Sequence, residues 1–285
     1  MSLSREYRFE QVVVSEVDLE QVYNLFVESF GNDLLAKDII RWQYAQNPLG
    51  NVVGFNAFSG DQLAAHYVTI PTQAWRSGIL KRGLLSINTA THPQHQKQGL
   101  FTKLAELTYA LGSELGYSYV VGVANQNSVH GFTRKLGFQH VEELERRFVF
   151  SKISRFEFSV LDFAGAWSQE RLAWRLAHPT KLNSYAAQKT EHGWNILGRT
   201  GRFLGLVGAI DEDSLPPNIL KTSSPILPRQ WIGLDAQINW SKTLNLRVPR
   251  RFEPIPLHLI FKSLENQETL DAKSLRFWAL DFDAY

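Results

Sequence analysis

The residues with the clearest chemical potential lie in a short polar loop that contains Gly99. The loop, residues 94–98, follows an apolar, β-branched stretch over residues 84–91, which ends at His92-Pro93. After Gly99, apolar residues recur at positions 100, 104, 107, 111 and 115, a spacing that predicts an amphipathic helix. The first N–H groups of a helix have no partner within it, and they face an anion with a favourable dipole. The pattern therefore predicts a phosphate-binding loop.

The candidate phosphate ligands are residues of this loop and of the first helical turn. Gly99 has no Cβ, so a phosphate can approach its backbone closely. The residues that follow offer backbone N–H donors, and Thr102 adds a hydroxyl. The candidates are Gln96, Gln98, Gly99, Leu100, Phe101 and Thr102.

Strands and helices that position the loop are expected throughout the first half. Hydrophobic periodicity, capping residues and turn residues define them. The expected strands cover residues 7–14, 52–58, 63–75, 84–91 and 117–124, and the expected helices cover residues 19–30, 35–46, 100–115 and 127–136.

Three motifs, in order, resemble those of the GNAT (GCN5-related) N-acetyltransferase superfamily. His92-Pro93 followed by residues 96–101, QKQGLF, is similar to its Q/R-x-x-G-x-G/A signature, although Phe101 replaces the small residue. Residues 125–128, NQNS, and residues 135–138, KLGF, resemble a later Asn-containing segment and a terminal turn. The resemblance covers about residues 7–150. It implies an α/β (α+β) fold with a mixed, mostly antiparallel sheet flanked by helices.

The resemblance also implies a cosubstrate, acetyl-CoA, whose pyrophosphate the loop amides hold. In the family, pantetheine lies between two splayed strands, here residues 84–91 and 117–124. Free amides near Thr89 and Thr91 would then pair with pantetheine and polarise the thioester carbonyl. Asn125 and Asn127 can also bond the pantetheine arm, and helix capping is their alternative role.

The family's usual acid and base are both missing from their expected positions. The position of the glutamate base falls on Leu85 or its neighbours, and that of the tyrosine acid falls on Thr133. We nominate His66, in the strand at 63–75, as a substitute base because a histidine titrates near neutral pH. A structural role is the alternative. The carboxylates Glu28 and Asp33 are further candidates.

Bulk properties restrict the remaining possibilities. The length of 285 residues suggests two domains, which we place at residues 1–150 and 151–285. A net charge of +2 gives no reason to expect nucleic acid or a membrane as a partner. There is no cysteine, and the eight histidines show no metal-ligand spacing, so no metal is expected. With no secretory signal or long apolar run, we expect a cytoplasmic protein.

The second half contains a weak internal echo of the first. Residues 41–48, RWQYAQNP, resemble residues 173–179, AWRLAHP, which suggests a degenerate GNAT-like or α+β domain, with chance similarity as the alternative. Residues 216–233 contain four prolines and no equivalent of the phosphate loop. We expect this half to wall the substrate cleft or to form a homodimer.

Together these features predict an acyl-CoA-dependent N-acyltransferase that acts on a primary amine of a small molecule, an amino sugar or an amino-acid-like amine. Direct attack is expected, since no cysteine or activated serine pattern provides a covalent intermediate. Two alternatives stay open: an aminoacyl or peptidyl transferase of tandem GNAT type, and a CoA-binding module without turnover.

Overall fold

The computed structural model describes residues 6–31, 35–156, 161–179, 185–200, 203–222, 228–249, 251 and 255–282. The first half contains β1 (Arg8–Gln11), α1 (Glu16–Phe30), α2 (Lys37–Ala45), β2 (Val53–Ser59), β3 (Gln62–Arg76), β4 (Ile79–Thr91), α3 (Leu100–Glu114), β5 (Tyr119–Asn125), β6 (Gln139–Glu143) and β7 (Glu145–Val149). The second half contains β8 (Phe163–Gly165), α4 (Gln169–Leu176), β9 (Tyr185–Thr190), β10 (Gly193–Thr200), β11 (Phe203–Ile210), β12 (Leu220–Thr222), β13 (Arg229–Asp235), β14 (Asn245–Arg247), β15 (Leu257–Ser263) and β16 (Leu275–Trp278).

Local sequence accounts for the ends of several of these helices. Ser15 caps α1 by accepting from the N–H of Asp18 at 3.2 Å, and Gly31 ends the same helix in the left-handed region. Ser168 caps α4 in the same way, through the N–H of Arg171. The expected helices and strands of the first half are confirmed to within a few residues at their ends, with two differences. The strand expected from residue 84 already begins at Ile79, and the helix expected at 127–136 is a short π-helical turn, Gly131–Lys135.

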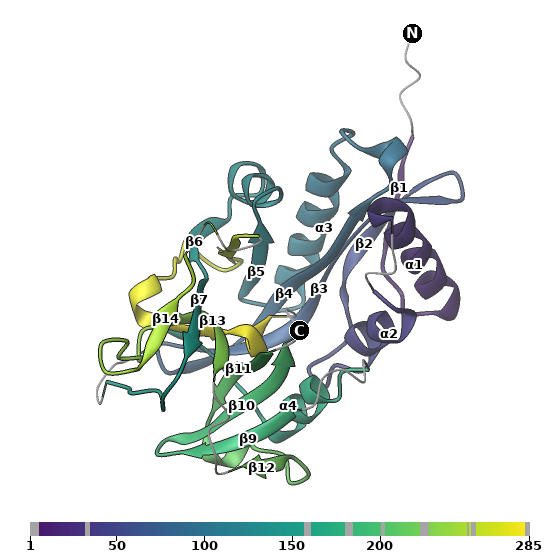
Figure 1. Ribbon diagram of the computed structural model, residues 1–285. Coiled ribbons are helices and arrows are strands. Elements are labelled where there is room, and N and C mark those ends of the chain that lie inside the picture. The colour runs from purple at the N-terminus through teal and green to yellow at the C-terminus, as the bar shows by residue number, and fades with distance from the viewer. Residues whose placement is uncertain are drawn as a thin grey trace.

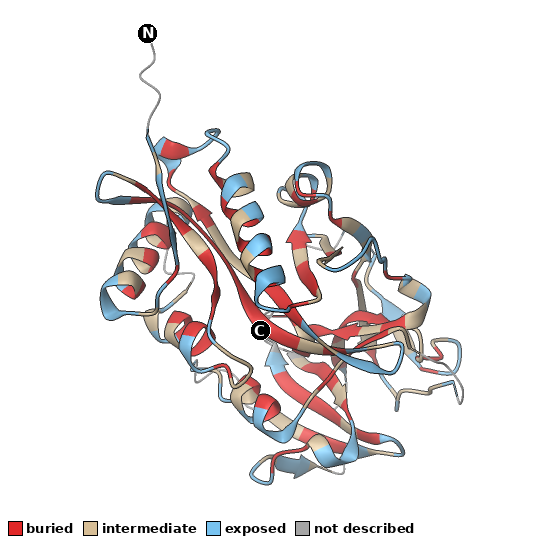
Figure 2. Cartoon of the chain, turned by 180° about the vertical axis from the view of Figure 1, so that it is seen from behind, coloured by how far each residue is buried: buried red, intermediate tan, exposed pale blue. Residues whose placement is uncertain are grey.

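All of the strands that the structure describes join in one mixed sheet, most of whose pairs are antiparallel. The main strand order is β12-β9-β10-β11-β13-β16-β8-β3-β4-β5-β15-β6. In the first half, α3 packs on one face of the sheet, whereas α1 and α2 pack on the other (Figure 1). Figure 2 shows the buried central strands and the exposed outer side of α3. The expected α+β class, with a strand-rich second half, is confirmed.

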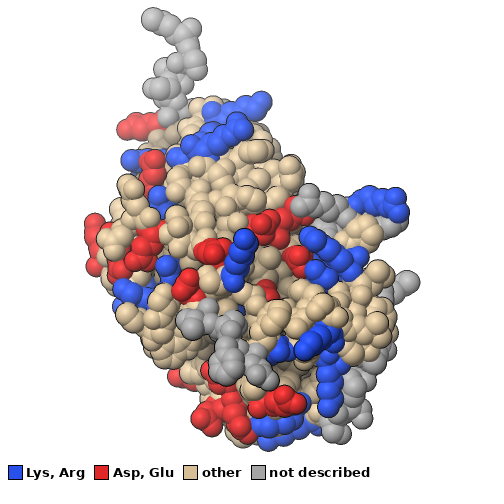
Figure 3. Space-filling model, turned by 90° about the vertical axis from the view of Figure 1, so that its left-hand side faces the viewer, with Lys and Arg blue, Asp and Glu red and all other residues tan. Residues whose placement is uncertain are grey.

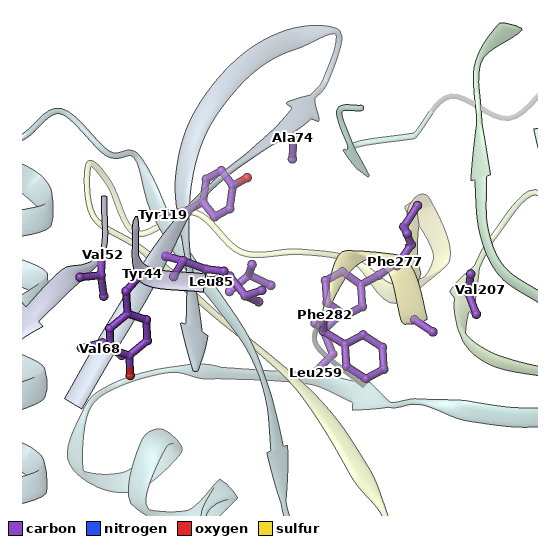
Figure 4. Close-up of a cluster of buried hydrophobic side chains, with 14 of the residues drawn as sticks. Tyr44, Val52, Val68, Ala74, Leu85, Tyr119, Val207, Leu259, Phe277 and Phe282 are labelled. Carbon is purple, nitrogen blue, oxygen red and sulfur yellow. The ribbon is translucent and has the colours of Figure 1, made fainter. Parts of the chain in front are cut away.

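The two halves are interlocked by strands that pass from one to the other. β15 lies between β5 and β6, with Leu257 opposite Asn125 and Phe261 opposite Val121 on β5. In return, β7 pairs with β13, and β8 pairs with β3. The core is shared as well, because Tyr119 and Leu85 belong to the same buried cluster as Val207 and Phe277 (Figure 4). The sheet therefore does not break at residue 150.

The second half repeats the order of elements found in the first. A helix, a hairpin and a third strand recur as α4, β9, β10 and β11, and β11 then pairs in parallel with β13 as β4 does with β5. The echoed tryptophans Trp42 and Trp174 stack on one another, with ring centroids 4.7 Å apart. Each indole N–H donates to the other residue's carbonyl, at 3.1 and 3.3 Å. The described residues between β11 and β13 contain no helix comparable to α3.

Candidate active site

The feature that organises the site is a gap between β4 and β5. The two strands pair in parallel only from Gly83–Tyr119 to Ser86–Gly122, and then diverge. Asn88 causes part of this divergence, because its backbone is left-handed (φ +44°) and the register of β4 against β3 shifts beside it. The expected splay of these strands is thus present.

Backbone N–H groups of β4 face this gap. The N–H of His92, directly after β4, donates to the carbonyl of Ala64 at 2.9 Å, on the side of β3. Backbone groups alternate between the two edges of a strand, so the N–H groups of Thr91 and Thr89 point to the opposite edge. They are therefore placed to pair with an extended ligand, and the binding of pantetheine there stays a prediction.

The loop that follows β4 presents an uncapped helix start. Lys97 and Gly99 both have positive φ, +62° and +76°, which turns the chain into α3. No side chain caps this helix, and its first described backbone bond runs from the N–H of Lys103 to the carbonyl of Gly99. The N–H groups of Leu100, Phe101 and Thr102 therefore have no partner in the helix.

The surroundings of this helix start suit an anion. A Cβ placed on Gly99 would meet no atom within 4 Å, so the space above the turn is open. Gln96, Lys97 and Gln98 are exposed there. Lys97 and Lys103 are the only charged side chains in the sequence from 90 to 105, and both are positive. The local field and the free donors thus favour a diphosphate.

The unexpected Phe101 does not block the loop. Its ring lies 5.2 Å from that of Phe132 and 5.8 Å from that of Tyr67, both edge-on. Leu100 is buried beneath the helix start, whereas Phe101 is half-buried. Both side chains point into the core, and each contributes only its N–H to the loop.

The two asparagines at the end of β5 make different contacts. The side-chain oxygen of Asn125 accepts from the N–H groups of Asn127 and Ser128, both at 3.0 Å. Asn125 is therefore the residue that caps the following turn, whereas Asn127 is exposed beside it. Their contacts with a pantetheine arm stay predictions.

A cavity of about 370 Å³ lies at the apex of the gap, on the face that carries α1 and α2. Most of the described side chains in its wall are apolar, and the polar ones are Ser86 and Asn88. The lining residues are Leu35, Leu85, Ser86, Ile87, Asn88, Val123, Leu257 and Phe282. Leu257 and Phe282 come from the second half, which thus walls one side of the cleft.

Asn88 connects this cavity to a buried polar chain. Its amide nitrogen donates to Gln43 at 2.6 Å and to the hydroxyl of Tyr44 at 3.3 Å. Tyr44 lies 2.8 Å from Nε2 of His66, and Nδ1 of His66 lies 2.6 Å from the side-chain oxygen of Asn56. This network fixes the side-chain amide of Asn88 so that its nitrogen faces Gln43 and Tyr44. The amide oxygen, a hydrogen-bond acceptor, points away from these two residues.

His66 itself does not reach the cavity. It is fully buried between Tyr44 and Asn56, and burial lowers its pKa to about 3. With Nδ1 donating to an amide oxygen, Nε2 accepts from the tyrosine hydroxyl, so the ring is neutral. The assignment of His66 as general base is not supported by this geometry. The residue is a structural group, the alternative that the sequence left open.

The other nominated groups are placed as follows. The hydroxyl of Thr133 donates to the carbonyl of Val129 at 2.9 Å, so it serves its own helical turn. Glu28 lies 3.3 Å from Nε2 of His92, near the end of β4. Asp33 lies outside the described residues.

A hydroxyl cluster that the sequence did not reveal lies at the last paired position of β4. The hydroxyl of Tyr67 is 2.8 Å from that of Ser86 and 2.6 Å from that of Tyr109. Burial raises the pKa of Tyr67 to about 12, so this phenol is protonated at neutral pH. The sequence gives little indication of this hydroxyl cluster, because a tyrosine in a buried strand is more often a packing residue.

A sequence-profile comparison decides the family. The profile of the Acetyltransferase (GNAT) domain matches residues 13–141, which contain the loop, the gap and the turn after β5. Residues 13–141 belong to the GNAT acetyltransferase family. The resemblance seen in the sequence is confirmed, and this GNAT domain is of a class that uses acyl-CoA.

Solved structures share the fold of the GNAT domain and of the second half together. A probable N-acyltransferase from Enterococcus faecalis V583 aligns with a TM-score of 0.59 at 11% identity, over 91% of this chain and 73% of that one. A GCN5-related N-acetyltransferase from Anabaena variabilis aligns with a TM-score of 0.56 at 11% identity, over 90% of this chain and 73% of that one. A GCN5-related N-acetyltransferase from Kribbella flavida aligns with a TM-score of 0.53 at 14% identity, over 90% of this chain and 71% of that one. A comparison with curated protein sequences found no match.

Two further observations concern only the part of the chain that the structure describes. No helix in it is long and apolar enough to cross a membrane. No three of its His, Asp or Glu side chains gather as a metal site. On the face drawn in Figure 3, basic and acidic side chains are interspersed rather than gathered by sign.

Proposed function

We propose that this protein transfers an acetyl group from acetyl-CoA to the amine of a small, largely apolar molecule. The observation that carries the proposal is the continuity of three features along β4. These are the uncapped start of α3, the N–H groups of Thr89 and Thr91, and the cavity at Ser86 and Asn88. The diphosphate would lie at the start of α3, the extended arm along Thr89 and Thr91, and the acceptor in the cavity.

The residues present fit the coenzyme. Open space above Gly99 and unpaired N–H groups at residues 100–102 suit the diphosphate, and the free edge of β4 suits the arm. When bound, acetyl-CoA supplies the thioester carbonyl that an amine attacks. The N–H groups on the free edge of β4 would polarise a carbonyl oxygen beside them.

The cavity favours an apolar acceptor over an amino sugar. Among the lining residues that the structure describes, only Ser86 and Asn88 bear polar side chains, and none is charged. A sugar's hydroxyl groups would lose their bonds to water there without replacement. The free oxygen of Asn88 accepts one N–H of the amine, which directs the nitrogen lone pair away from Asn88.

The chain's own groups would assist the transfer without forming a covalent bond to the acyl group. A new nitrogen–carbon bond forms as the carbon–sulfur bond breaks, and the proton that the amine loses balances the one that the thiolate gains. Ser86, backed by the hydroxyl of Tyr67, is the described hydroxyl positioned at the apex of the gap. A cavity at the end of the expected coenzyme arm, where an acceptor can lie, favours an enzyme over a binding module.

Release of free thiol from acetyl-CoA, followed across matched amines, tests the proposal. We expect aralkyl and alkyl amines to be better acceptors than amino sugars of similar size. Asn88→Gly keeps the left-handed backbone without strain and removes the amide, so kcat/KM for the amine should fall about tenfold or more. Ser77→Gly is the matched control, because Ser77 has a similar φ of +46° in the turn between β3 and β4.

Three results would contradict the proposal. One is the absence of thiol release with every amine, and another is a preference for amino sugars. The third is an Asn88→Gly enzyme that is as active toward amines as the Ser77→Gly enzyme.

A further inference from the structure

A second cavity, of about 240 Å³, lies in the second half of the chain. It is built where β9 ends and β10 begins, against the end of β11, residue Arg276 on β16 and the segment at 155–156. It shares no lining residue with the cavity at Asn88. Its lining is more polar than that of the acceptor cavity and includes two guanidinium groups, Arg155 and Arg276.

The two arginines differ in how far their charges are neutralised. Arg155 lies 3.2 Å from a carboxylate oxygen of Asp235 and 3.4 Å from the amide oxygen of Gln237. The same Asp235 oxygen also accepts from the indole N–H of Trp278 at 3.0 Å. Arg276 makes no hydrogen bond or ion pair with any residue that the structure describes, although its charge interacts at longer range with the buried carboxyl of Asp281. A guanidinium in a half-buried position thus has donors available to a ligand.

Asn195 supplies a second, independent indication of a ligand. Only 6% of this residue is exposed, and it lies on β10 between Gln188 and Ala209. Its side chain lines the cavity, yet it has no hydrogen-bond partner among the described residues. Its amide atoms are not among the fully buried, unpartnered ones, so they open onto the cavity, where a ligand can pair with them. The amide N–H of Asn195 and the guanidinium of Arg276 therefore offer unpaired donors to the same space.

Other lining groups limit what the ligand can be. Phe156 and Trp194 add aromatic surface, and Thr190 adds a hydroxyl. Asp211, an exposed carboxylate at the end of β11, also lines the cavity and opposes a highly charged anion. The volume admits a single small molecule, below the size of most drug-like ligands.

We propose that this cavity binds a small organic or inorganic oxyanion, a carboxylate or a phosphate, between Arg276, Arg155 and Asn195. Arginine presents paired N–H donors whose geometry matches these anions. An aromatic or apolar remainder of the ligand lies against Phe156 and Trp194. The site belongs to the second half alone and does not depend on acetyl transfer at the first.

Calorimetric titration of the full-length protein tests the site with two probes, benzoate and inorganic phosphate, at constant ionic strength. Benzamide, a neutral analogue of benzoate, is the ligand control. Arg276→Gln removes the free guanidinium, and Asn195→Asp replaces an amide by a carboxylate of the same shape. Each should weaken the probe that binds by about tenfold or more. Arg247→Gln, which removes an exposed guanidinium on β14, should leave binding unchanged.

The outcomes separate the two ligand classes and the failure of the proposal. Binding of benzoate alone assigns a carboxylate site, binding of phosphate alone assigns a phosphate site, and binding of both assigns a general oxyanion site. Absence of binding by both probes overturns the proposal. So does equal binding of benzamide, or an affinity in the Arg276→Gln protein that matches the Arg247→Gln protein. Asn195→Asp gives an independent result if Arg276→Gln fails to fold.

Discussion

Burial of His66 makes the stability of the fold sensitive to mild acid. The ring is fully buried, its Nδ1 donates to Asn56, and its Nε2 accepts from the Tyr44 hydroxyl. A second ring proton would have to displace the proton of the tyrosine. Burial therefore lowers the pKa of His66 from 6.5 to about 3 in the folded state.

The sign and size of the effect follow from proton linkage. Below pH 6.5 the unfolded chain binds a proton at this histidine, whereas the folded chain does not until about pH 3. The contribution of His66 to stability is thus complete above pH 6.5 and declines as the pH falls through this window. The loss is about 1.4 kcal/mol per pH unit, so it reaches about 2 kcal/mol at pH 5.

Urea unfolding at pH 7.5 and pH 5, for the wild type and for His66→Gln, measures this loss. Gln has no titrating group. Between pH 7.5 and pH 5, the free energy of unfolding of the variant should therefore fall by about 2 kcal/mol less than that of the wild type. His130→Gln, which removes an exposed histidine, should behave like the wild type. Equal pH dependence of the wild type and His66→Gln would show that His66 is protonated in the folded state, and the buried neutral ring would be refuted.

Two further predictions concern the contact between the halves. Trp42→Phe and Trp174→Phe should show a coupling of roughly 1–3 kcal/mol in a double-mutant cycle by urea unfolding, because the rings stack and exchange two hydrogen bonds. Additive effects would refute the coupling. A fragment of residues 1–150 should give poorly dispersed amide NMR signals, because it lacks β15, which pairs with β5 and β6. A cooperatively folded fragment would contradict this.

The loop and its helix could be predicted because their signals are local. Gly99 marks a positive φ, and the apolar spacing after it defines the buried side of α3. Ser15 and Ser168 likewise mark helix starts within a few residues. Each of these features depends on residues close in sequence, so a single chain is enough to reveal it.

The return of β15 and the burial of His66 could not be predicted in the same way. β15 pairs with β5 across more than a hundred residues, and no local pattern specifies such a partner. β3 is buried on both faces, from Leu63 to Thr72, so alternation does not reveal which way His66 points. The roles of Asn125 and Asn127 depended on turn geometry, which residue type alone does not distinguish.

The most direct test is thermal unfolding with and without CoA in two alanine variants of the same helix. Gly99 and Gly116 flank α3, with φ of +76° and +77°, and an added Cβ meets nothing within 4 Å at either. Each substitution should therefore lower the free energy of unfolding by a similar amount, about 1–2 kcal/mol, through backbone strain. CoA at 100-fold its dissociation constant should stabilise the wild type and Gly116→Ala by about 2.7 kcal/mol, and Gly99→Ala far less. Equal stabilisation of both variants, or none of the wild type, would contradict diphosphate binding at the start of α3.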